Sequence, residues 1–225
     1  MARWTPLPRR FYLRHPVEVA PELLNKLLVR DDGRAGRIVE VEAYSGADDP
    51  AAHSFRGKTA RNATMFGDGG HMYVYFTYGM HWCANAVCGK GQGWGVLLRA
   101  IEPVAGIELM RKARGHPAKD RDIGSGPGKL GQAMGIDRAL DGADLVRGDR
   151  GVWIMSDGTP PPDEPVAGPR VGIRHAVEHP WRFHVPAHAH VSRARAGVPP
   201  PLRSGAAGAG TGAGAKKKPA RGRLP

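Results

Sequence analysis

The stretch that decides the fold is an alternating run near the N-terminus, Arg37-Ile38-Val39-Glu40-Val41-Glu42-Ala43-Tyr44. Its even-numbered positions carry an isoleucine, two glutamates and a tyrosine, and its odd-numbered positions are apolar from Val39 onward. A period of two is typical of a β-strand, so this strand is predicted to place both carboxylates on the face that also holds Ile38 and Tyr44. The alternation alone leaves two interpretations open: a surface strand with solvated glutamates, or a strand that carries a carboxylate into a functional site.

A β-hairpin is predicted further along the chain. Residues 73–77 are aromatic and β-branched, and residues 82–87 form a second short apolar run, so both favour strands. Gly79 lies between them and can adopt the positive φ that a tight turn needs. The tip would carry Tyr78 and Met80. Large apolar groups at a hairpin tip either pack under a neighbouring loop or enter a partner, as do side chains that wedge between base steps.

The remaining patterns predict one α+β domain, with a curved, mainly antiparallel β-sheet, surrounding helices and a protruding hairpin. Residues 94–101 read as a buried strand containing Arg99, whose partner is expected to be a carboxylate. A leucine stripe predicts a helix over Pro21–Leu28. Further expectations are helices over 103–114 and within 125–136, short strands over 152–155 and 170–173, and a strand face shared by His188 and His190.

Composition and charge divide the chain into two parts. It has 225 residues, 41% of them hydrophobic, which suits one domain with a sizeable core over residues 1–195. Eight of the twelve net positive charges lie after residue 191, where there is no acid, which leaves only +4 for residues 1–191. Residues 196–225 are rich in Gly, Ala, Pro, Lys and Arg and are predicted to be a disordered basic tail, either a solvated end or a tether to DNA.

The sequence also indicates a compartment. It has no apolar run of signal-peptide or membrane-spanning length, so no membrane partner is expected. Its two cysteines, Cys83 and Cys88, suit a reduced environment, and we expect a cytoplasmic protein, nucleoid-associated if bacterial.

Several blocks in one order and spacing resemble the alkyladenine (3-methyladenine) DNA glycosylase family, from about Phe11 to Val191. The blocks are residues 37–44, Ala51-Ala52-His53-Ser54, Arg61-Asn62, residues 72–85, Val96-Leu97-Leu98-Arg99-Ala100 and Ser125-Gly126-Pro127-Gly128-Lys129-Leu130. The resemblance implies an enzyme of base excision repair. It would flip an alkylated or deaminated purine out of double-stranded DNA and hydrolyse the bond to deoxyribose.

The resemblance also implies roles for single residues. Glu42 matches the general base and Arg99 a residue that orients the water and the sugar-phosphate. Glu40 has no assigned role, but periodicity does not separate it from Glu42. The other matches are Tyr44, His53 and Tyr75 for stacking on the base, Asn85 for discrimination between purines, Tyr78 with Met80 for intercalation, and Arg61 with Lys129 for the DNA backbone.

Some activities are disfavoured. Lys129 follows glycines as in a phosphate-binding loop, but Ile123 stands where the first glycine belongs and Leu130 replaces the hydroxyl residue. The catalytic block has no lysine, so a lyase step through a Schiff base is not expected. We expect a monomer with no cofactor. No metal is expected either, because no cysteine or carboxylate lies at ligand spacing near His188 and His190 and the resemblance implies none. The alternative is a noncatalytic DNA-binding protein that uses the hairpin as a wedge.

Overall fold

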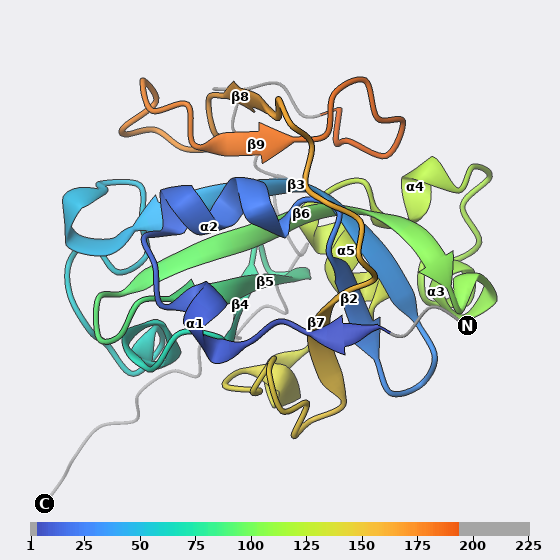
Figure 1. Ribbon diagram of the computed structural model, residues 1–225, viewed down its shortest axis with the longest axis horizontal. Helices are drawn as coiled ribbons and strands as arrows, with labels where there is room; N and C mark the ends of the chain where they lie inside the picture. Colours follow the sequence, from blue (N-terminus) through green and yellow to red (C-terminus); the bar gives the residue numbers. More distant parts are fainter. Residues whose placement is uncertain (1–3, 194–225) are drawn as a thin grey trace, which may run out of the picture.

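The computed structural model describes residues 4–193, and the predicted tail at 196–225 lies outside this range. One sheet with antiparallel pairings organises the described chain (Figure 1). Its path runs β1-β7-β2-β3-β6-β5-β4, and β9 joins β3 and β8 beside it. The strands are β1 (Thr5–Pro6), β2 (Leu27–Arg30), β3 (Ala35–Ser45), β4 (Met72–Thr77), β5 (His81–Cys88), β6 (Trp94–Ala105), β7 (Val152–Ser156), β8 (Val166–Gly168) and β9 (Arg182–His184).

The helices are short and pack around this sheet. They are α1 (Arg9–Tyr12), α2 (Pro16–Leu23), α3 (Ile107–Ala113), α4 (Arg121–Gly124) and α5 (Pro127–Ala133), with 3₁₀ turns η1 (Gly46–Asp48), η2 (Ala63–Phe66) and η3 (Arg138–Leu140). The α+β class and the curved, mainly antiparallel sheet are therefore confirmed. None of the helices in the described part of the chain has the length and hydropathy needed to cross a membrane.

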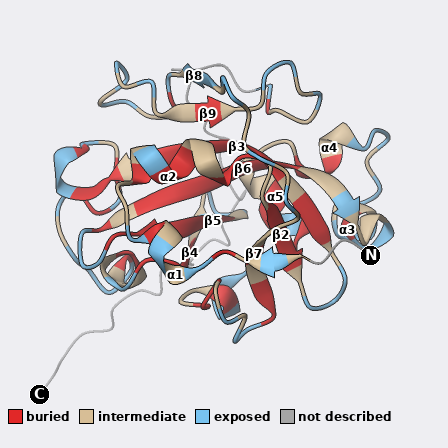
Figure 2. Ribbon diagram, in the orientation of Figure 1, coloured by how far each residue is buried: buried red, intermediate tan, exposed pale blue. Residues whose placement is uncertain are grey.

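β3 is the central strand. It pairs with β6 along its whole length on one edge, and its other edge is shared between β2 at residues 35–37 and β9 at residues 40–42. Buried residues run along most of β3 and β6 (Figure 2). Because β3 is covered on both edges and both faces, polar side chains on it must find partners inside the protein.

A bulge changes which residues of β3 share a face. The register with β6 shifts between Ile38 and Glu40 and again between Glu40 and Val41. Ile38 consequently packs in the main core with Val41 and Ala43. The prediction that Ile38 lies on the face of Glu42 was wrong, because an inserted residue reverses the alternation of faces.

The helix predicted over Pro21–Leu28 was also wrong. The helix runs over Pro16–Leu23, with Pro16 in its first turn, and Asn25 then reverses the chain at φ 66°. Leu27 and Leu28 continue into β2, where they pair with both β3 and β7. Leucines at positions 23, 24, 27 and 28 have the spacing of one face of a helix. Here they are divided between the end of a helix and a buried strand.

Other boundaries moved for local reasons. β6 continues through Pro103 to Ala105 and ends at Gly106, whose φ is 63°, so the helix predicted over 103–114 is only Ile107–Ala113. The proline lies opposite Gly36, beside a register shift, where a missing N–H is tolerated. The helix within 125–136 and the strand at 152–155 are confirmed as α5 and β7.

Two further strand predictions fail. Residues 170–173 form no strand, and neither His188 nor His190 belongs to a strand: His190 lies in a turn, and His188 lies between two turns. The short strand that borders Glu40 and Glu42 is instead β9, which the sequence patterns did not reveal.

Candidate active site

The candidate site is built on one row of directly paired residues across four strands. Glu42 on β3 pairs with Leu97 on β6, Leu97 with Asn85 on β5, and Asn85 with Tyr73 on β4. This row lies beside a cavity of about 360 Å³. The cavity is lined by Glu42, Tyr44, Pro50, Ala51, His53, Met65, Tyr73, Tyr75, Thr77, Tyr78, His81, Cys83, Asn85, Leu97, Arg99, Pro127, Gly128 and residues 171–175.

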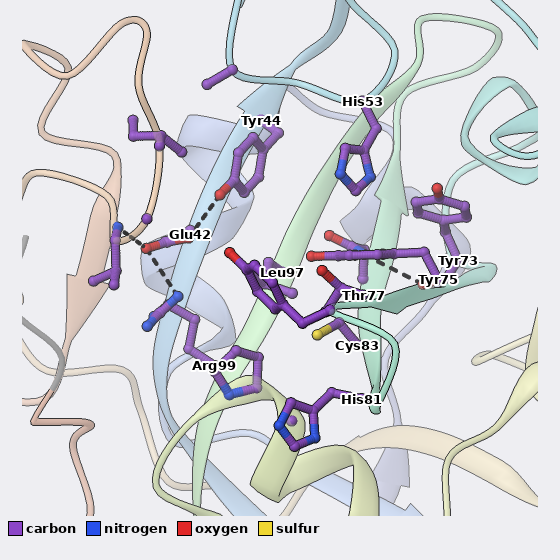
Figure 3. A pocket seen from close by; sticks show the side chains of 18 of the residues that line it. Glu42, Tyr44, His53, Tyr73, Tyr75, Thr77, His81, Cys83, Leu97 and Arg99 are labelled. Atoms are coloured by element: carbon purple, nitrogen blue, oxygen red, sulfur yellow. Dashed lines mark hydrogen bonds and ion pairs between the residues drawn. The ribbon is translucent and has the colours of Figure 1, made fainter. Parts of the chain in front are cut away.

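Glu42 is fully buried and held by three donors. The Tyr44 hydroxyl donates to Oε2 at 2.8 Å, the Val171 N–H donates to Oε1 at 2.6 Å, and Arg99 Nη1 lies 3.2 Å from Oε1 (Figure 3). A carboxylate offers about four lone-pair positions, so it can still accept a hydrogen bond from a water. The group is thus oriented at the cavity wall with acceptor capacity left.

Arg99 joins Glu42 to the neighbouring Glu40. Arg99 Nε donates to Glu40 Oε1 at 3.0 Å, so one guanidinium bridges two buried carboxylates. Although burial opposes it, the charges of Glu42 and Glu40 raise the pKa of Arg99. The expectation that a carboxylate accompanies Arg99 is confirmed, and two carboxylates share it.

Glu40 is a structural anchor rather than a solvated side chain. It accepts from Arg182 Nε at 2.6 Å, from the Ser192 hydroxyl at 3.0 Å and from the Ser192 N–H at 2.8 Å. Burial alone would raise the pKa of this carboxyl, but Arg99 and Arg182 outweigh burial and hold it below its usual value. The solvated-strand interpretation is therefore excluded for both glutamates.

Aromatic rings form the walls of the cavity. Figure 3 shows Tyr44 and Glu42 on one side, with His53, Tyr73 and Tyr75 on the other. The His53 and Tyr75 rings meet edge to face at 4.4 Å, and Tyr73 stacks on Tyr75 at 5.7 Å. Burial raises the pKa of Tyr44 and Tyr75 well above the usual value and lowers the pKa of His53. These groups are uncharged at neutral pH.

Asn85 and Tyr44 owe their positions to neighbours in the sheet. Asn85 is buried, and its amide N–H donates to the Tyr73 carbonyl at 3.4 Å, which leaves its side-chain oxygen as an acceptor. Gly95 pairs directly with Tyr44, and a side chain at this position would contact Met65 and Asn85. The Asn85 and Tyr44 side chains both line the cavity, and their base-binding role stays a prediction.

A buried ion pair supports the Tyr44 wall, and sequence reasoning missed it. Arg170 Nη2 donates to Asp49 Oδ1 at 2.8 Å, and both side chains are completely buried. The Arg170 guanidinium lies 4.6 Å from the Tyr44 ring centroid and 5.1 Å from that of Trp181. It therefore fixes the backbone at Val171, whose N–H reaches Glu42. The partners are 121 residues apart, so no local pattern could have paired them.

The turn between β4 and β5 carries exposed apolar side chains. Tyr78 has φ 53° and is 58% exposed, and Met80 is 48% exposed. Tyr78 also lines the cavity, whereas Met80 does not. Tyr78 is therefore placed between the cavity and solvent, beside the strand that carries Tyr75.

The two residues expected at the DNA backbone lie outside the cavity lining. Arg61 Nη2 donates to the Phe76 carbonyl at 2.9 Å and so braces β4. Lys129 Nζ lies 3.4 Å from the Ser125 hydroxyl and 3.8 Å from Asp122 Oδ1. Both side chains are at the surface, and their expected role stays a prediction.

One grouping within residues 4–193 has the composition of a metal site. Glu102, His188 and His190 bring one ligand atom each to within 4.8 Å of one another. The expectation that no carboxylate accompanies these histidines was wrong, because Glu102 arrives from β6. This grouping does not line the cavity.

Comparison with known proteins agrees with this geometry. The sequence model of the methylpurine-DNA glycosylase family matches residues 10–189. Two proteins named "Putative 3-methyladenine DNA glycosylase" are similar over most of their length. The one from Burkholderia lata is 59% identical over 83% of this chain and 90% of its own, and the one from Streptomyces avermitilis is 47% identical over 87% and 94%. The chain therefore belongs to the methylpurine-DNA glycosylase family and is a DNA glycosylase that acts on DNA in the repair of alkylation damage.

Proposed function

We propose that this protein is a monofunctional, monomeric glycosylase that binds damaged duplex DNA, flips an alkylated purine into the aromatic cavity and releases it by hydrolysis. The observation that carries the proposal is Glu42 at the cavity wall, oriented by Tyr44, Arg99 and the Val171 N–H. A cavity of about 360 Å³ is in the range of small-ligand sites. Deaminated purines are the second substrate class that such a cavity could accept.

The aromatic walls favour an alkylated base. A purine carrying a methyl group on a ring nitrogen is electron-poor or cationic, and ring faces attract such groups. Tyr44, His53 and Tyr75 are uncharged, and the Glu42 carboxylate lies at the cavity wall. Two guanidinium groups near these side chains are paired with buried carboxylates: Arg99 with Glu40 and Glu42, and Arg170 with Asp49. Asn85 presents an amide oxygen that distinguishes exocyclic donors from acceptors.

The chemical step needs one carboxylate. An alkylated purine is a good leaving group, so the bond to the sugar lengthens and positive charge develops on the sugar. Glu42 stabilises that charge and accepts a proton from a water, whose oxygen bonds to the anomeric carbon. The electron pair of the broken bond leaves with the base. Arg99 orients Glu42 and the water, and the products are a free purine and an abasic site.

The turn between β4 and β5 supplies what flipping requires. Removing a nucleotide from the stack costs a few kcal/mol, and the vacancy must be filled. Tyr78 lies at the cavity mouth with most of its ring exposed, and Met80 stands two residues away. In this proposal Tyr78 enters the duplex while the damaged base occupies the cavity, and Arg61 and Lys129 contact backbone phosphates.

The direct test is release of free base. The full chain would be incubated with duplex DNA treated with a methylating agent, and released purines would be separated by chromatography and identified by mass. The proposal requires a methylated purine in the supernatant and a strand that breaks only after alkali or heat. Tight binding with no released base would favour a noncatalytic wedge protein, and strand breaks without alkali would contradict the absence of a lyase step.

A further inference from the structure

The chain holds a second cluster of chemically capable side chains that the proposed reaction does not use. Glu102 belongs to β6, whereas His188 and His190 belong to the segment that follows β9. Glu102 Oε2 lies 3.5 Å from His188 Nε2, and Glu102 Oε1 lies 4.0 Å from His190 Nδ1. Segments that are distant in sequence therefore converge on one small polar site.

The imidazole ring of His190 lacks hydrogen-bond partners. Both of its ring nitrogens are inaccessible to solvent and have no hydrogen-bond partner within residues 4–193. A buried polar group without a partner is costly, so native structures seldom retain one without a reason. Imidazole nitrogens are common metal ligands, and a metal ion would satisfy the nitrogen that faces Glu102.

The ligand chemistry selects the class of metal. Two imidazoles and one carboxylate form a ligand set that Zn²⁺ uses with a water in the fourth position. Bonds of about 2.1 Å at tetrahedral angles place ligand atoms roughly 3.4 Å apart. The atoms here lie within 4.8 Å of one another, so shifts of about 1 Å would complete the site. Mg²⁺ prefers six oxygen ligands and does not fit this set.

We propose that Glu102, His188 and His190 bind Zn²⁺ or a similar borderline divalent metal. The ion lies between Glu102 and His188 Nε2, and the neutral His188 ring then carries its one proton on Nδ1. It gives His190 Nδ1, the ring nitrogen that faces Glu102, a partner. The weak hydrogen bond from the backbone N–H of His190 to His188 Nδ1, at 3.3 Å, is then lost, because Nδ1 carries the ring proton of His188.

A metal at this site also affects how Ser192 is held against Glu40. Two residues after His190, Ser192 makes two hydrogen bonds to Glu40. A metal that ties the histidines to β6 also holds Ser192 against that carboxylate. The site thus links the segment that follows β9 to the central sheet. It is independent of the proposed hydrolysis, and it can be tested without measuring activity.

The test uses the untagged full chain after removal of metals with a chelator. Zn²⁺, Co²⁺ and Mg²⁺ would be titrated separately, with calorimetry for stoichiometry, visible absorption of Co²⁺ for ligand geometry and thermal unfolding for stability. We expect one Zn²⁺ per chain, a Co²⁺ absorption spectrum typical of four or five ligands, a raised Tm with Zn²⁺ or Co²⁺, and none of these with Mg²⁺.

Variants locate the metal. Glu102→Gln and His190→Gln should each lower Zn²⁺ affinity at least ~10-fold. Glu102 is partly exposed, so its variant should fold even if the His190 variant does not. His179→Gln is the matched control, because His179 belongs to the same histidine-rich region and stacks on Trp181 instead. No Zn²⁺-dependent shift in the chelated protein, or unchanged affinity in Glu102→Gln, would overturn the proposal.

Discussion

Replacing Glu40 with glutamine is the perturbation whose effect the structure defines most closely. The Glu40 carboxylate is completely buried and accepts from Arg99, Arg182 and both polar groups of Ser192. In Glu40→Gln the amide oxygen can keep the contacts of Oε1. Its NH₂ group then faces the Ser192 N–H, which is also a donor, and two guanidinium groups lose a countercharge.

The expected cost follows from this loss. Breaking a buried ion pair by removing one partner destabilises a protein by about 3–5 kcal/mol. For a domain of this size each 1 kcal/mol lowers Tm by roughly 2–4 °C. Glu40→Gln should therefore lower Tm by roughly 6–20 °C.

Thermal unfolding measured by circular dichroism tests this value. Glu108→Gln is the matched control, because Glu108 makes an ion pair with Arg111 but is 84% exposed, and its loss should change stability by less than about 0.5 kcal/mol. A Tm for Glu40→Gln within about 1 °C of the wild type would refute the anchoring role.

The difference should also depend on pH. Since the folded-state pKa of Glu40 is depressed, its contribution is fully present above the unfolded value of 4.5 and is lost as the pH falls through the folded value. The stability gap between wild type and Glu40→Gln should therefore be constant near neutrality and narrow below pH 4.5. A gap that widens in acid would contradict the assigned direction.

Two further predictions concern DNA binding. Tyr78→Ser should weaken binding to lesion-containing duplex by ~1–3 kcal/mol while leaving Tm unchanged, because the exposed ring supports little core; unchanged binding and an unchanged fluorescent-base signal would remove Tyr78 as the wedge. A chain ending at Ala196 should keep its single-turnover rate at saturating DNA but bind nonspecific DNA less tightly, with a shallower salt dependence, because the removed residues carry net positive charge and no acid; loss of the rate would contradict this division of roles.

Local sequence patterns were sufficient to predict the central strands of the sheet. The alternation at residues 37–44, the aromatic run at 73–77 and the apolar run at 94–101 all became strands of one sheet. The residues that matched the family's base-binding positions, Tyr44, His53, Tyr75 and Asn85, meet at one cavity with Glu42, Arg99 and Tyr78. Their placement together was predictable, and their chemical roles stay predictions.

The predictions that failed concern features set by contacts between residues that are distant in the sequence. The bulge near Val39 moved Ile38 into the core, and only the pairing of β3 with β6 reveals it. β9 is three residues long, and it is a strand because β3 and β8 flank it.

The supports of the site are equally nonlocal. Val171 reaches Glu42 across 129 residues, and Ser192 reaches Glu40 across 152. The role of Glu40 was missed for the same reason, since periodicity shows a face but not the partners that occupy it.

The central claim is that Glu42 activates the water, and Glu42→Gln tests it most directly. Glutamine keeps the size of the side chain but removes its negative charge and its capacity to accept a proton. The single-turnover rate of base release from methylated duplex, measured well below Tm, should fall by about two orders of magnitude or more. Binding to the same duplex should stay within a few-fold, because the aromatic walls and Tyr78 are untouched.

Two control variants accompany the rate measurement on Glu42→Gln. Glu108→Gln should keep the wild-type rate, and Glu40→Gln should lose less rate than Glu42→Gln at a temperature where it is folded, since Arg99 keeps its contact with Glu42. The account predicts a Glu42→Gln protein that binds lesion DNA and scarcely releases base. A Glu42→Gln protein that retains the wild-type rate, while folded Glu40→Gln binds DNA but releases no base, would contradict it and assign the proton acceptor to Glu40.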